Sequence, residues 1–527
     1  MVSARLAATV ALALAAAACA AAPAAHPPPA APAPAAVAAD QWASITLYLA
    51  LTDRFADGDA RNDDLGEPDC FAPSDPDRFH GGDIAGLRQH LPYLRELGVG
   101  ALWITPLPRQ VPLRAGACGY HGYWADESLP DEGAMEPKLG TIADVTALAT
   151  DLHAAGMKLV LDVVVNHPGR GARITRQAPW LFHDESTCAP LGDPVVFCPL
   201  HGLPDYAQEK PEAAQYLTAM SRRWVERTLP DGVRVDTAKH VPPAYFAASF
   251  VPAVRAARPG LFLLAEYFDT TDIARVRPTL DAGFDSAFDF PLHEALVTAF
   301  ARGESVNAVA DVVAHARAVL GEGRASHLVS FLDNHDVPRF LAQAAAGTPD
   351  AELARRYAMA LAVLFTLPEI PQLYQGDELA MAHAGANDRA DMPAWSWDPA
   401  TRVGTHPGFV GDAQATWQRV RSLARLRATE PALSRGTYVE LHREDAEGNV
   451  LAYVRTTTDA ARPVLVVVSN DTRPTTITLR FERVPGWSPD AILRALTPAS
   501  SPGATVVRGS DRALAVPPLS VGVYGSG

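Results

Sequence analysis

Acidic side chains stand at or near the ends of several short apolar runs, and these positions suggest chemistry. They are Asp162, Asp236, Glu266 and Asp336. In the strand that we expect at Val233–Thr237, alternation places Arg234 and Asp236 on the same face. A single Asp after a strand is most simply a helix cap or part of a surface ion pair, but carboxylates at four strand ends require another reason. We therefore expect these groups to meet at one edge of a sheet.

Cleavage of a glycosidic bond is the chemistry that such a group of carboxylates suits best. The reaction needs one carboxylate as nucleophile or stabiliser and one protonated carboxyl group that assists the leaving oxygen. A second negative charge nearby would raise the pKa of the acid, as this role requires. Arg and His side chains in the same segments would complete the site.

The elements that would position these carboxylates alternate regularly from residue 41 onward. Strands are expected at Ile45–Phe55, Gly100–Thr105, Lys158–Val165, Val233–Thr237, Leu261–Phe268, Phe284–Phe290, His327–Leu332 and Thr366–Tyr374. Amphipathic stretches between them, such as Ile142–Ala155, predict helices. Eight strands with intervening helices predict an α/β fold, a closed (β/α)8 TIM barrel with its active site at the C-terminal strand ends. A doubly wound open sheet is the alternative, but no glycine-rich phosphate loop follows the first strand.

Two regions interrupt this alternation. Residues 167–205 are rich in Pro, Gly, His and Asp and have no helical period, which predicts a small subdomain inserted after the third strand, at about 167–208. After about residue 430 the pattern changes to period-two runs, which predict a C-terminal antiparallel β-sandwich domain over 431–527. The barrel would accordingly occupy 41–430.

The first forty residues are typical of a targeting segment. One Arg precedes the apolar run Leu6–Ala18, which is too short to span a bilayer but fits a signal-peptide core. We assign residues 1–19 to a signal peptide and the Ala/Pro-rich residues 20–40 to an extended linker. Ala16–Cys19 resembles the lipobox of bacterial lipoproteins, although Ala stands where Leu is usual. Lipid attachment at Cys19 and ordinary cleavage at an Ala-x-Ala site both predict an exported protein, either anchored to the cell envelope or secreted.

Net charge and cysteine content limit the partners and the compartment. The chain has 527 residues and a net charge of −15, and so acidic a protein repels phosphate backbones, which excludes nucleic acid as a partner. No later segment is long and apolar enough for a transmembrane helix, so a membrane is expected only through the lipid. If Cys19 carries lipid, four cysteines remain, and export favours their oxidation over four free thiols. The simplest pairing joins Cys188 to Cys198 and Cys70 to Cys118.

Along most of residues 45–430 the chain resembles glycoside hydrolase family 13, the α-amylase family. The four signature segments of that family occur in order at Asp162–His167, Gly232–His240, Ala265–Phe268 and Phe331–Asp336. Further similarities are Thr52–Asp59, Gly119–Trp124, Leu203–Asp205 and Tyr374–Glu378. Any one of these segments alone would be weak evidence for this family, but the whole set in this order is strong evidence for the resemblance.

The resemblance implies a role for each matched residue. Asp236 would be the nucleophile, Glu266 the general acid/base, and Asp336 the carboxylate that holds sugar hydroxyls and stabilises the oxocarbenium-like transition state. Arg234 would lie beside Asp236 and keep it ionised. The other implied substrate contacts are His121, Tyr123, His167 and His335 around the sugar before the scissile bond, and Lys239 and His240 on the leaving-group side.

The resemblance also implies Ca²⁺ as a cofactor, at two places. One ligand set is Asn166, Asp205 and the backbone carbonyl of His240, which would join the inserted subdomain to the barrel. The other set lies on the loops after the first strand and comprises Asp57, Asp59, Asn62, Asp63, Gly81 and Asp83. Clustered oxygens suit Ca²⁺, which takes about six to eight oxygen ligands. For the second set, a solvated Asp/Asn turn is the alternative.

These observations predict a retaining glycosidase that cleaves α-1,4 bonds in starch-like α-glucans or maltooligosaccharides, as an α-amylase does. However, Tyr374–Met381 and Asp388–Trp395 look more like relatives that act on short oligosaccharides or cyclodextrins. A cyclodextrin- or maltooligosaccharide-processing hydrolase or a glucanotransferase of the same family is therefore an alternative. A non-catalytic relative that only binds glycans or a partner would be expected to lack one of the three carboxylates, and this chain has all three.

Overall fold

The computed structural model describes residues 41–65, 67–113, 116–129, 133–382, 388–443, 449–458, 462–496, 506–511 and 513–525. The predicted signal peptide and linker, including Cys19, lie outside the described residues. Within the described part of the chain, no helix combines the length and the apolar character that crossing a membrane requires.

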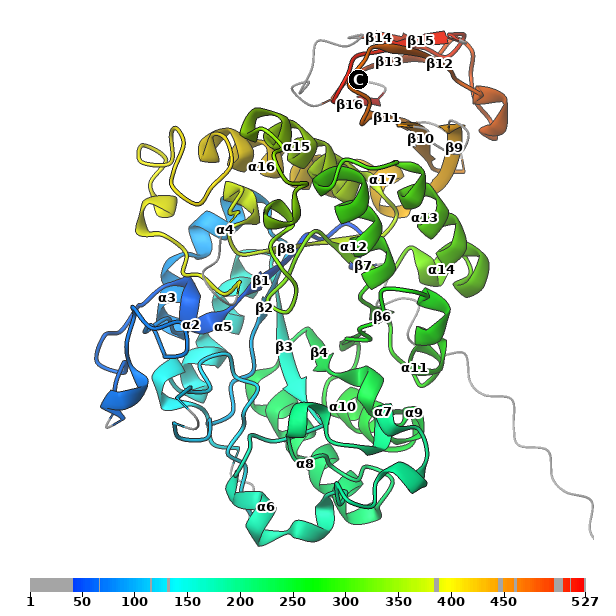
Figure 1. The fold of residues 1–527 in the computed structure, drawn as a ribbon. Helices are drawn as coiled ribbons and strands as arrows, with labels where there is room; N and C mark the ends of the chain where they lie inside the picture. The colour runs from blue at the N-terminus through cyan, green and yellow to red at the C-terminus, as the bar shows by residue number, and fades with distance from the viewer. Residues whose placement is uncertain are drawn as a thin grey trace, which may run out of the picture. The chain divides into compact units, whose positions relative to one another are not determined.

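Eight parallel strands form the centre of the fold (Figure 1). They are β1 (Leu47–Ala50), β2 (Ala101–Ile104), β3 (Lys158–Val164), β4 (Gly232–Asp236), β5 (Phe262–Ala265), β6 (Ser286–Ala287), β7 (Val329–Phe331) and β8 (Ile370–Tyr374). The hydrogen-bonded order is β6-β5-β4-β3-β2-β1-β8-β7, and a parallel bridge between Phe288 and Val329 joins the two ends. The predicted (β/α)8 barrel is therefore confirmed.

Helices connect these strands and cover the outside of the barrel (Figure 1). The longer ones are α5 (Ile142–Ala154), α8 (Pro211–Thr228), α13 (Asn307–Leu320), α15 (Asp350–Thr366) and α16 (Ala413–Thr429). The shorter ones are α2 (Thr52–Phe55), α3 (Ile84–Gln89), α4 (Leu91–Leu97), α9 (Pro243–Tyr245), α10 (Val251–Ala257), α11 (Arg277–Asp281), α12 (Phe290–Leu296) and α14 (Glu322–Ala325). Helix α8 shows the general pattern, because it buries Leu217, Met220 and Trp224 along one face.

Local hydrogen bonds shorten several of the predicted strands. The run Ile45–Phe55 contains β1 and then the single helical turn α2. The run Phe284–Phe290 is reduced to β6, because the Asp289 side chain accepts a hydrogen bond from the Leu292 backbone at 2.9 Å and so caps α12. Thr366, expected in the last strand, ends helix α15.

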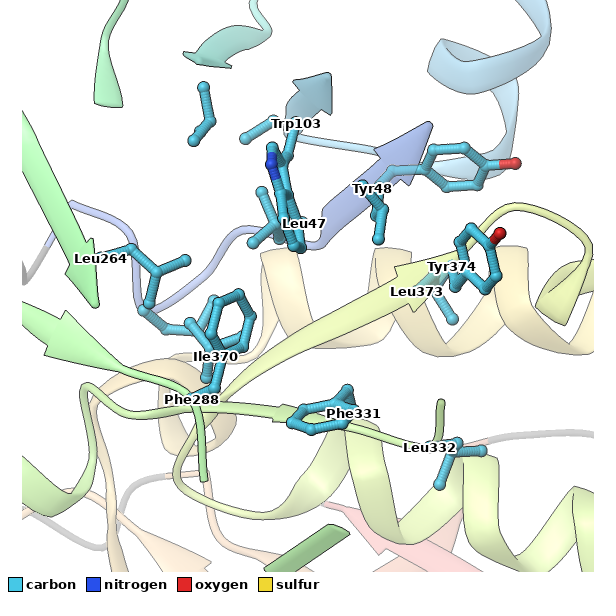
Figure 2. Packing of buried hydrophobic residues seen from close by; sticks show 14 of the residues in the cluster. Leu47, Tyr48, Trp103, Leu264, Phe288, Phe331, Leu332, Ile370, Leu373 and Tyr374 are labelled. Carbon is cyan, nitrogen blue, oxygen red and sulfur yellow. The ribbon is translucent and has the colours of Figure 1, made fainter. Parts of the chain in front are cut away.

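The barrel interior has a charged layer that packs on an apolar layer. Asp162, Arg234 and Leu264 are register partners on β3, β4 and β5, so their side chains share the inner face. Trp103 and Phe288 belong to the apolar cluster of the barrel interior (Figure 2), and their ring centroids lie 5.4 Å apart. The guanidinium carbon of Arg234 lies 5.2 Å from the Trp103 centroid, which joins the two layers.

The segment after β3 contains only short helical turns, among them α6 (Arg173–Gln177) and α7 (Pro194–Phe197). A disulfide between Cys188 and Cys198 closes a loop within this segment. A second disulfide joins Cys70 to Cys118 and so ties the loop after β1 to the loop after β2. Both predicted pairings are confirmed.

Beyond α17 (Pro431–Arg435), the chain forms two antiparallel sheets with their own apolar core, which includes Leu465, Ile477 and Leu514. The six-stranded sheet has the order β14-β13-β16-β11-β10-β9 and the other pairs β12 with β15. The strands are β9 (Thr437–Arg443), β10 (Val450–Thr456), β11 (Val464–Ser469), β12 (Thr475–Thr478), β13 (Ile492–Ala495), β14 (Val506–Arg508), β15 (Ala513–Val516) and β16 (Ser520–Gly525). The antiparallel architecture matches the prediction, but β13 and β14 were not predicted, because Ile-Leu-Arg-Ala and Val-Val-Arg do not alternate between apolar and polar residues.

Candidate active site

Arg234 links three carboxylates at the C-terminal ends of β3, β4 and β5. Its Nη1 donates to Oδ1 of Asp162 at 2.9 Å and to Oδ1 of Asp236 at 2.7 Å, and its Nη2 lies 2.9 Å from Oε1 of Glu266. The Arg234 residue is only 1% exposed, so these charges interact at low dielectric. The predicted cation beside Asp236 is therefore present.

Glu266 is held in a largely buried position against the same group. Its Oε2 accepts a hydrogen bond from the backbone of Thr237 at 2.7 Å, and the Thr237 hydroxyl donates to Oδ2 of Asp236 at 3.0 Å. Burial is the largest cause that raises the pKa of Glu266; Arg234 opposes it and Asp236 and Asp336 add to it, and the net pKa is about 8. The sequence predicted a raised pKa from a neighbouring negative charge, whereas burial is the larger cause.

Asp162 lies behind these two carboxylates. Besides Arg234, it accepts hydrogen bonds from Nε1 of Trp103 at 3.1 Å and from the hydroxyl of Tyr123 at 2.7 Å. Burial raises its pKa to about 7. Because its oxygens are occupied by protein donors, Asp162 serves to orient Arg234 and Tyr123.

Asp336 is the third predicted catalytic carboxylate and follows β7. Its Oδ1 accepts a hydrogen bond from Nη2 of Arg389 at 2.9 Å, and its Oδ2 lies 3.1 Å from Nε2 of His335. Burial would raise the pKa of Asp336, but His335 and Arg389 outweigh burial and hold it below its ordinary value. The side chain keeps 33% of its surface exposed, so it can reach a ligand.

Neutral histidines surround this carboxylate. Burial lowers the pKa of His121, of His167 and of His335, the last to about 4. The Tyr123 hydroxyl lies 2.6 Å from Nε2 of His335, and the plane of the Tyr123 ring is nearly parallel to the His335 and His121 rings, with centroids 5.3 Å and 5.7 Å away. A neutral imidazole carries one donor and one acceptor, which suits the binding of hydroxyl groups.

Two adjoining cavities of about 400 Å³ and 380 Å³ form a cleft over these residues. Both are lined by His121, Trp124, Asp336 and Arg389. The larger cavity is also lined by Tyr123, His167, Asp236, Lys239, His240 and Glu266, and the smaller by Tyr120 and His335. The structure thus brings all the predicted catalytic and sugar-contacting residues to one cleft, with Arg234 buried beneath it.

The larger cavity also has apolar side chains in its lining. Leu200, Leu203 and Phe268 line it, and Phe268 is 46% exposed. Nζ of Lys239 donates to the backbone carbonyl of Phe268 at 2.8 Å. Nδ1 of His240 lies 2.8 Å from the backbone carbonyl of Val195, so the inserted segment contacts the cleft here.

Three oxygens of the first predicted calcium set converge. The amide oxygen of Asn166 lies 3.0 Å from the backbone carbonyl of His240 and 3.2 Å from Oδ1 of Asp205. The other oxygen of Asp205 accepts a hydrogen bond from His183 at 2.7 Å. Among the described residues, no three His, Cys, Asp or Glu side chains form a group that could hold a metal, so this set depends on amide and carbonyl oxygens.

The second predicted set also contains oxygens without partners. Oδ1 of Asn62 and Oδ1 of Asp63 are buried and meet no hydrogen-bond donor in the described part of the chain. Gly81, with φ of 97°, passes so close that a Cβ there would lie 2.9 Å from Oδ1 of Asp63. Asp83 instead caps α3, and Asp59 pairs with Arg61 in solvent. The structure therefore brings only part of this predicted ligand set together.

Burial raises the pKa of Asp63 to about 6, and the neighbouring Asp57 and Asp83 add to this effect. The accumulation of negative charge around two unpaired oxygens is what a cation would relieve.

Arg389 and Phe268 are the main cleft residues to which the sequence gave no role. Phe268 lies in a signature segment, but its exposure depends on the surrounding loops. Arg389 lies within Asp388–Trp395, a segment without periodicity, and it contacts a carboxylate that is 53 positions away in the chain. Trp124, whose role the sequence left open, lines both cavities.

Comparisons with known proteins agree with this geometry. The family model "Alpha amylase, catalytic domain" matches residues 49–179 and 196–420. An α-amylase of Streptomyces lividans is 26% identical over 76% of this chain, which spans only about half, 52%, of that relative's length. A cyclomaltodextrinase of a Bacillus species is 29% identical over 80% of this chain and 72% of its own length.

Among solved structures, the α-amylase of Geobacillus thermoleovorans complexed with acarbose superposes with a TM-score of 0.76 at 27% identity, covering 92% of this chain and 98% of that one. The matched family model extends over more than half of the chain and includes every carboxylate of the cleft. The chain therefore belongs to the α-amylase family of glycoside hydrolases.

Proposed function

We propose that the chain is a retaining glycosidase that hydrolyses α-1,4 bonds in starch-like α-glucans or maltooligosaccharides. The observation that carries this proposal is that one buried guanidinium, Arg234, holds Asp236 and Glu266 together while burial raises the pKa of Glu266 to about 8. A carboxylate and a neighbouring carboxylic acid are the pair that glycoside cleavage with retention requires.

In the first step, an oxygen of Asp236 attacks the anomeric carbon while Glu266 gives its proton to the leaving oxygen. The glycosidic bond breaks, the leaving sugar departs, and a glycosyl ester forms on Asp236. In the second step, Glu266 takes a proton from water, the water oxygen attacks the anomeric carbon, and the ester breaks. Two inversions return the original α configuration.

Asp336 supports both steps by binding sugar hydroxyls. Its pKa lies below the ordinary value and Arg389 donates to it, so Asp336 stays anionic and can stabilise the positive charge that develops on the sugar ring. The neutral imidazoles of His121 and His167 can donate to and accept from the same sugar. The Tyr123 ring offers a flat face for stacking.

The apolar side chains in the lining of the larger cavity favour a second candidate, transfer to a sugar in place of water. Leu200, Leu203 and the exposed Phe268 ring can bind the apolar face of a sugar, with Lys239 and His240 available for its hydroxyls. A bound sugar there could attack the ester on Asp236. The match to a cyclomaltodextrinase instead favours a hydrolase that acts on cyclodextrins or short maltooligosaccharides.

Chromatography of products from starch, maltooligosaccharides, cyclodextrin and pullulan, sampled early and late, separates these candidates. Hydrolysis gives only products with no more glucose units than the substrate at all times, and it first opens a cyclodextrin to a linear chain of the same length. Early products longer than a maltooligosaccharide substrate would identify a transferase. A folded protein that changes none of the four substrates would contradict the proposal.

We propose further that Ca²⁺ binds among Asn166, Asp205 and the carbonyl of His240. In this orientation of Asn166 the three oxygens face one another without a donor between them, and a cation placed there would relieve their repulsion. An Asn166 amide turned by 180° would satisfy the same oxygens without an ion, and calcium analysis decides between the two. An ion there would supply charge that fixes the inserted segment to the barrel beside the cleft.

A second Ca²⁺ is proposed beside Asn62 and Asp63. Their unpaired buried oxygens, with Asp57 and the backbone of Gly81 nearby, supply the start of an oxygen shell. Asp59 would have to leave Arg61 to join it. Such an ion would order the loops that follow β1.

For localisation, we propose export and a lipid anchor at Cys19. The proposal rests on the apolar run, the Ala16–Cys19 sequence and the two disulfides, which are typical of an oxidising compartment. Cys19→Ser should release the protein from the membrane fraction or block its processing. A soluble wild-type protein that begins after residue 19 would show ordinary cleavage instead.

A further inference from the structure

The single helical turn α2 carries an ion pair that the proposed mechanism does not use. Asp53 and Arg54 are 1% and 3% exposed, and Nε of Arg54 donates to Oδ2 of Asp53 at 2.7 Å. Nη2 of Arg54 donates to the backbone carbonyls of Pro76 at 3.0 Å and Arg78 at 2.6 Å. Burying this ion pair costs desolvation energy. We therefore asked what the pair does for the structure around it.

One face of the Arg54 guanidinium packs on a ring that lines the cleft. Its central carbon lies 3.8 Å from the ring centroid of Tyr120, a residue that lines the smaller cavity. Burial alone would lower the pKa of Arg389, but Asp336 and then Tyr120 outweigh it and raise the pKa above its ordinary value. Tyr120 thus stands between Arg54 and the arginine that holds Asp336.

The backbone around Arg389 is tied to the same turn. The Met392 N–H donates to the carbonyl of Arg54 at 2.9 Å, and Nη1 of Arg54 lies 3.5 Å from the carbonyl of Arg389. Asp391 lies 2.7 Å from Nδ1 of His80, whose backbone N–H donates to Asp53 at 3.0 Å. Residues 389–392 are therefore anchored by Asp53 and Arg54.

We propose that Arg54 is a positioning residue for the third carboxylate, Asp336. It fixes the Tyr120 ring and the 389–392 segment, so that Arg389 holds Asp336 at 2.9 Å in the orientation needed at the sugar. This inference rests on the role proposed for Asp336. Lysine could not replace Arg54 fully, because a point charge cannot stack on Tyr120 and donate to two carbonyls at once.

The first test compares Arg54→Met with Arg427→Met. Both side chains are buried and donate to backbone carbonyls, but those of Arg427 belong to Ala43 and the end of α15. At a temperature where both variants are folded, Arg54→Met should lower kcat/KM about 10- to 100-fold, mainly through kcat. Arg427→Met should stay within about twofold of wild type. Equal losses in the two variants would reduce Arg54 to a structural role and overturn the inference.

A double-mutant cycle then tests whether Arg54 acts through Arg389. If it does, Arg54→Met adds at most about a further twofold loss to Arg389→Met, because the contact that it positions is already gone. Fully multiplicative losses would contradict the inference. Arg54→Lys should recover part of the kcat that Arg54→Met loses.

Crystal structures of wild type and Arg54→Met test the positioning without any substrate. The inference predicts that Nη2 of Arg389 leaves Oδ1 of Asp336 in the variant. An unchanged Arg389–Asp336 contact would overturn it, whatever the activity. An inactive wild type would instead count against the proposed function, so the two failures are distinguishable.

Discussion

Arg234 and Arg427 are both fully buried, yet their surroundings differ in kind. Arg234 contacts the carboxyl groups of Asp162, Asp236 and Glu266, whereas Arg427 donates to neutral backbone carbonyls around the end of α15. Burial disfavours both cations, and it lowers the pKa of Arg427 to about 9. At Arg234 the carboxylates outweigh burial and hold its pKa well above the ordinary value.

The two buried arginines therefore differ in whether their partners can change protonation state. Carbonyls at a helix end need hydrogen-bond donors but not a full positive charge. Arg427 therefore has a structural role, because it donates to carbonyls around the end of α15. The groups around Arg234 are reactive carboxyls whose protonation depends on it. The same residue type thus satisfies neutral carbonyls in one region and, in the proposed mechanism, supports catalysis in the other.

The largest effect should come from the two groups that act on the bond. Asp236→Asn and Glu266→Gln should each lower kcat by at least about 1,000-fold, because the nucleophile or the proton donor is lost. Steady-state hydrolysis of a maltooligosaccharide measures the loss, and circular dichroism checks that the fold survives. Turnover near the wild-type value in either variant would refute the proposed roles.

Next come the two arginines themselves. Arg234→Met should abolish activity and cost about 3–5 kcal/mol of unfolding free energy, because three buried carboxyls lose their counter-charge. Arg427→Met should cost about 1–3 kcal/mol through its unsatisfied carbonyls and leave turnover intact at permissive temperature. Denaturant unfolding and kinetics on the same samples measure both. A stable, active Arg234→Met variant would contradict the claim that the two arginines have different roles.

Much of the barrel could be predicted because each strand is a short apolar run with a helical stretch beyond it. The residues at which each strand starts and stops could not be predicted, because they depend on single hydrogen bonds such as the Asp289 cap on α12. In the C-terminal sheets, β13 and β14 show too few alternations to be seen. These features arise from tertiary contacts and leave no periodic signal.

The site divides in the same way. Asp236, Glu266 and Asp336 were found because they lie in motifs at strand ends. The contact between Arg389 and Asp336, and the left-handed φ of 46° by which Thr237 presents its N–H to Glu266, depend on loop geometry that composition does not encode. For Glu266, the sequence predicted the direction of the pKa shift but not its main cause, burial.

A smaller, graded effect is expected from pH. Since the pKa of Glu266 is raised to about 8, its proton is retained below that pH and lost above it. The value of kcat/KM should therefore fall about tenfold per unit as pH rises beyond 8. A pH–rate profile measures this limb. If the limb lies near pH 5, Glu266 is not the buried acid described here.

The smallest effect should come from the metal sites. Chelation should lower the melting temperature by several degrees and reduce activity, with added Ca²⁺ restoring both. Asp205→Asn and Asp63→Asn should each weaken this response, whereas Asp59→Asn, a matched change at a carboxylate already paired with Arg61, should weaken it less. Calorimetry with and without chelator measures the response. No response, together with no calcium by elemental analysis, would remove the metal proposals and leave the catalytic ones.

The most direct test of the central claim is the configuration of the first product released. Proton NMR of a maltooligosaccharide digest, recorded before mutarotation, reports the anomer at the new reducing end. Attack by Asp236 followed by water activated through Glu266 predicts the α anomer. A β anomer would mean direct inversion by water and would contradict the account.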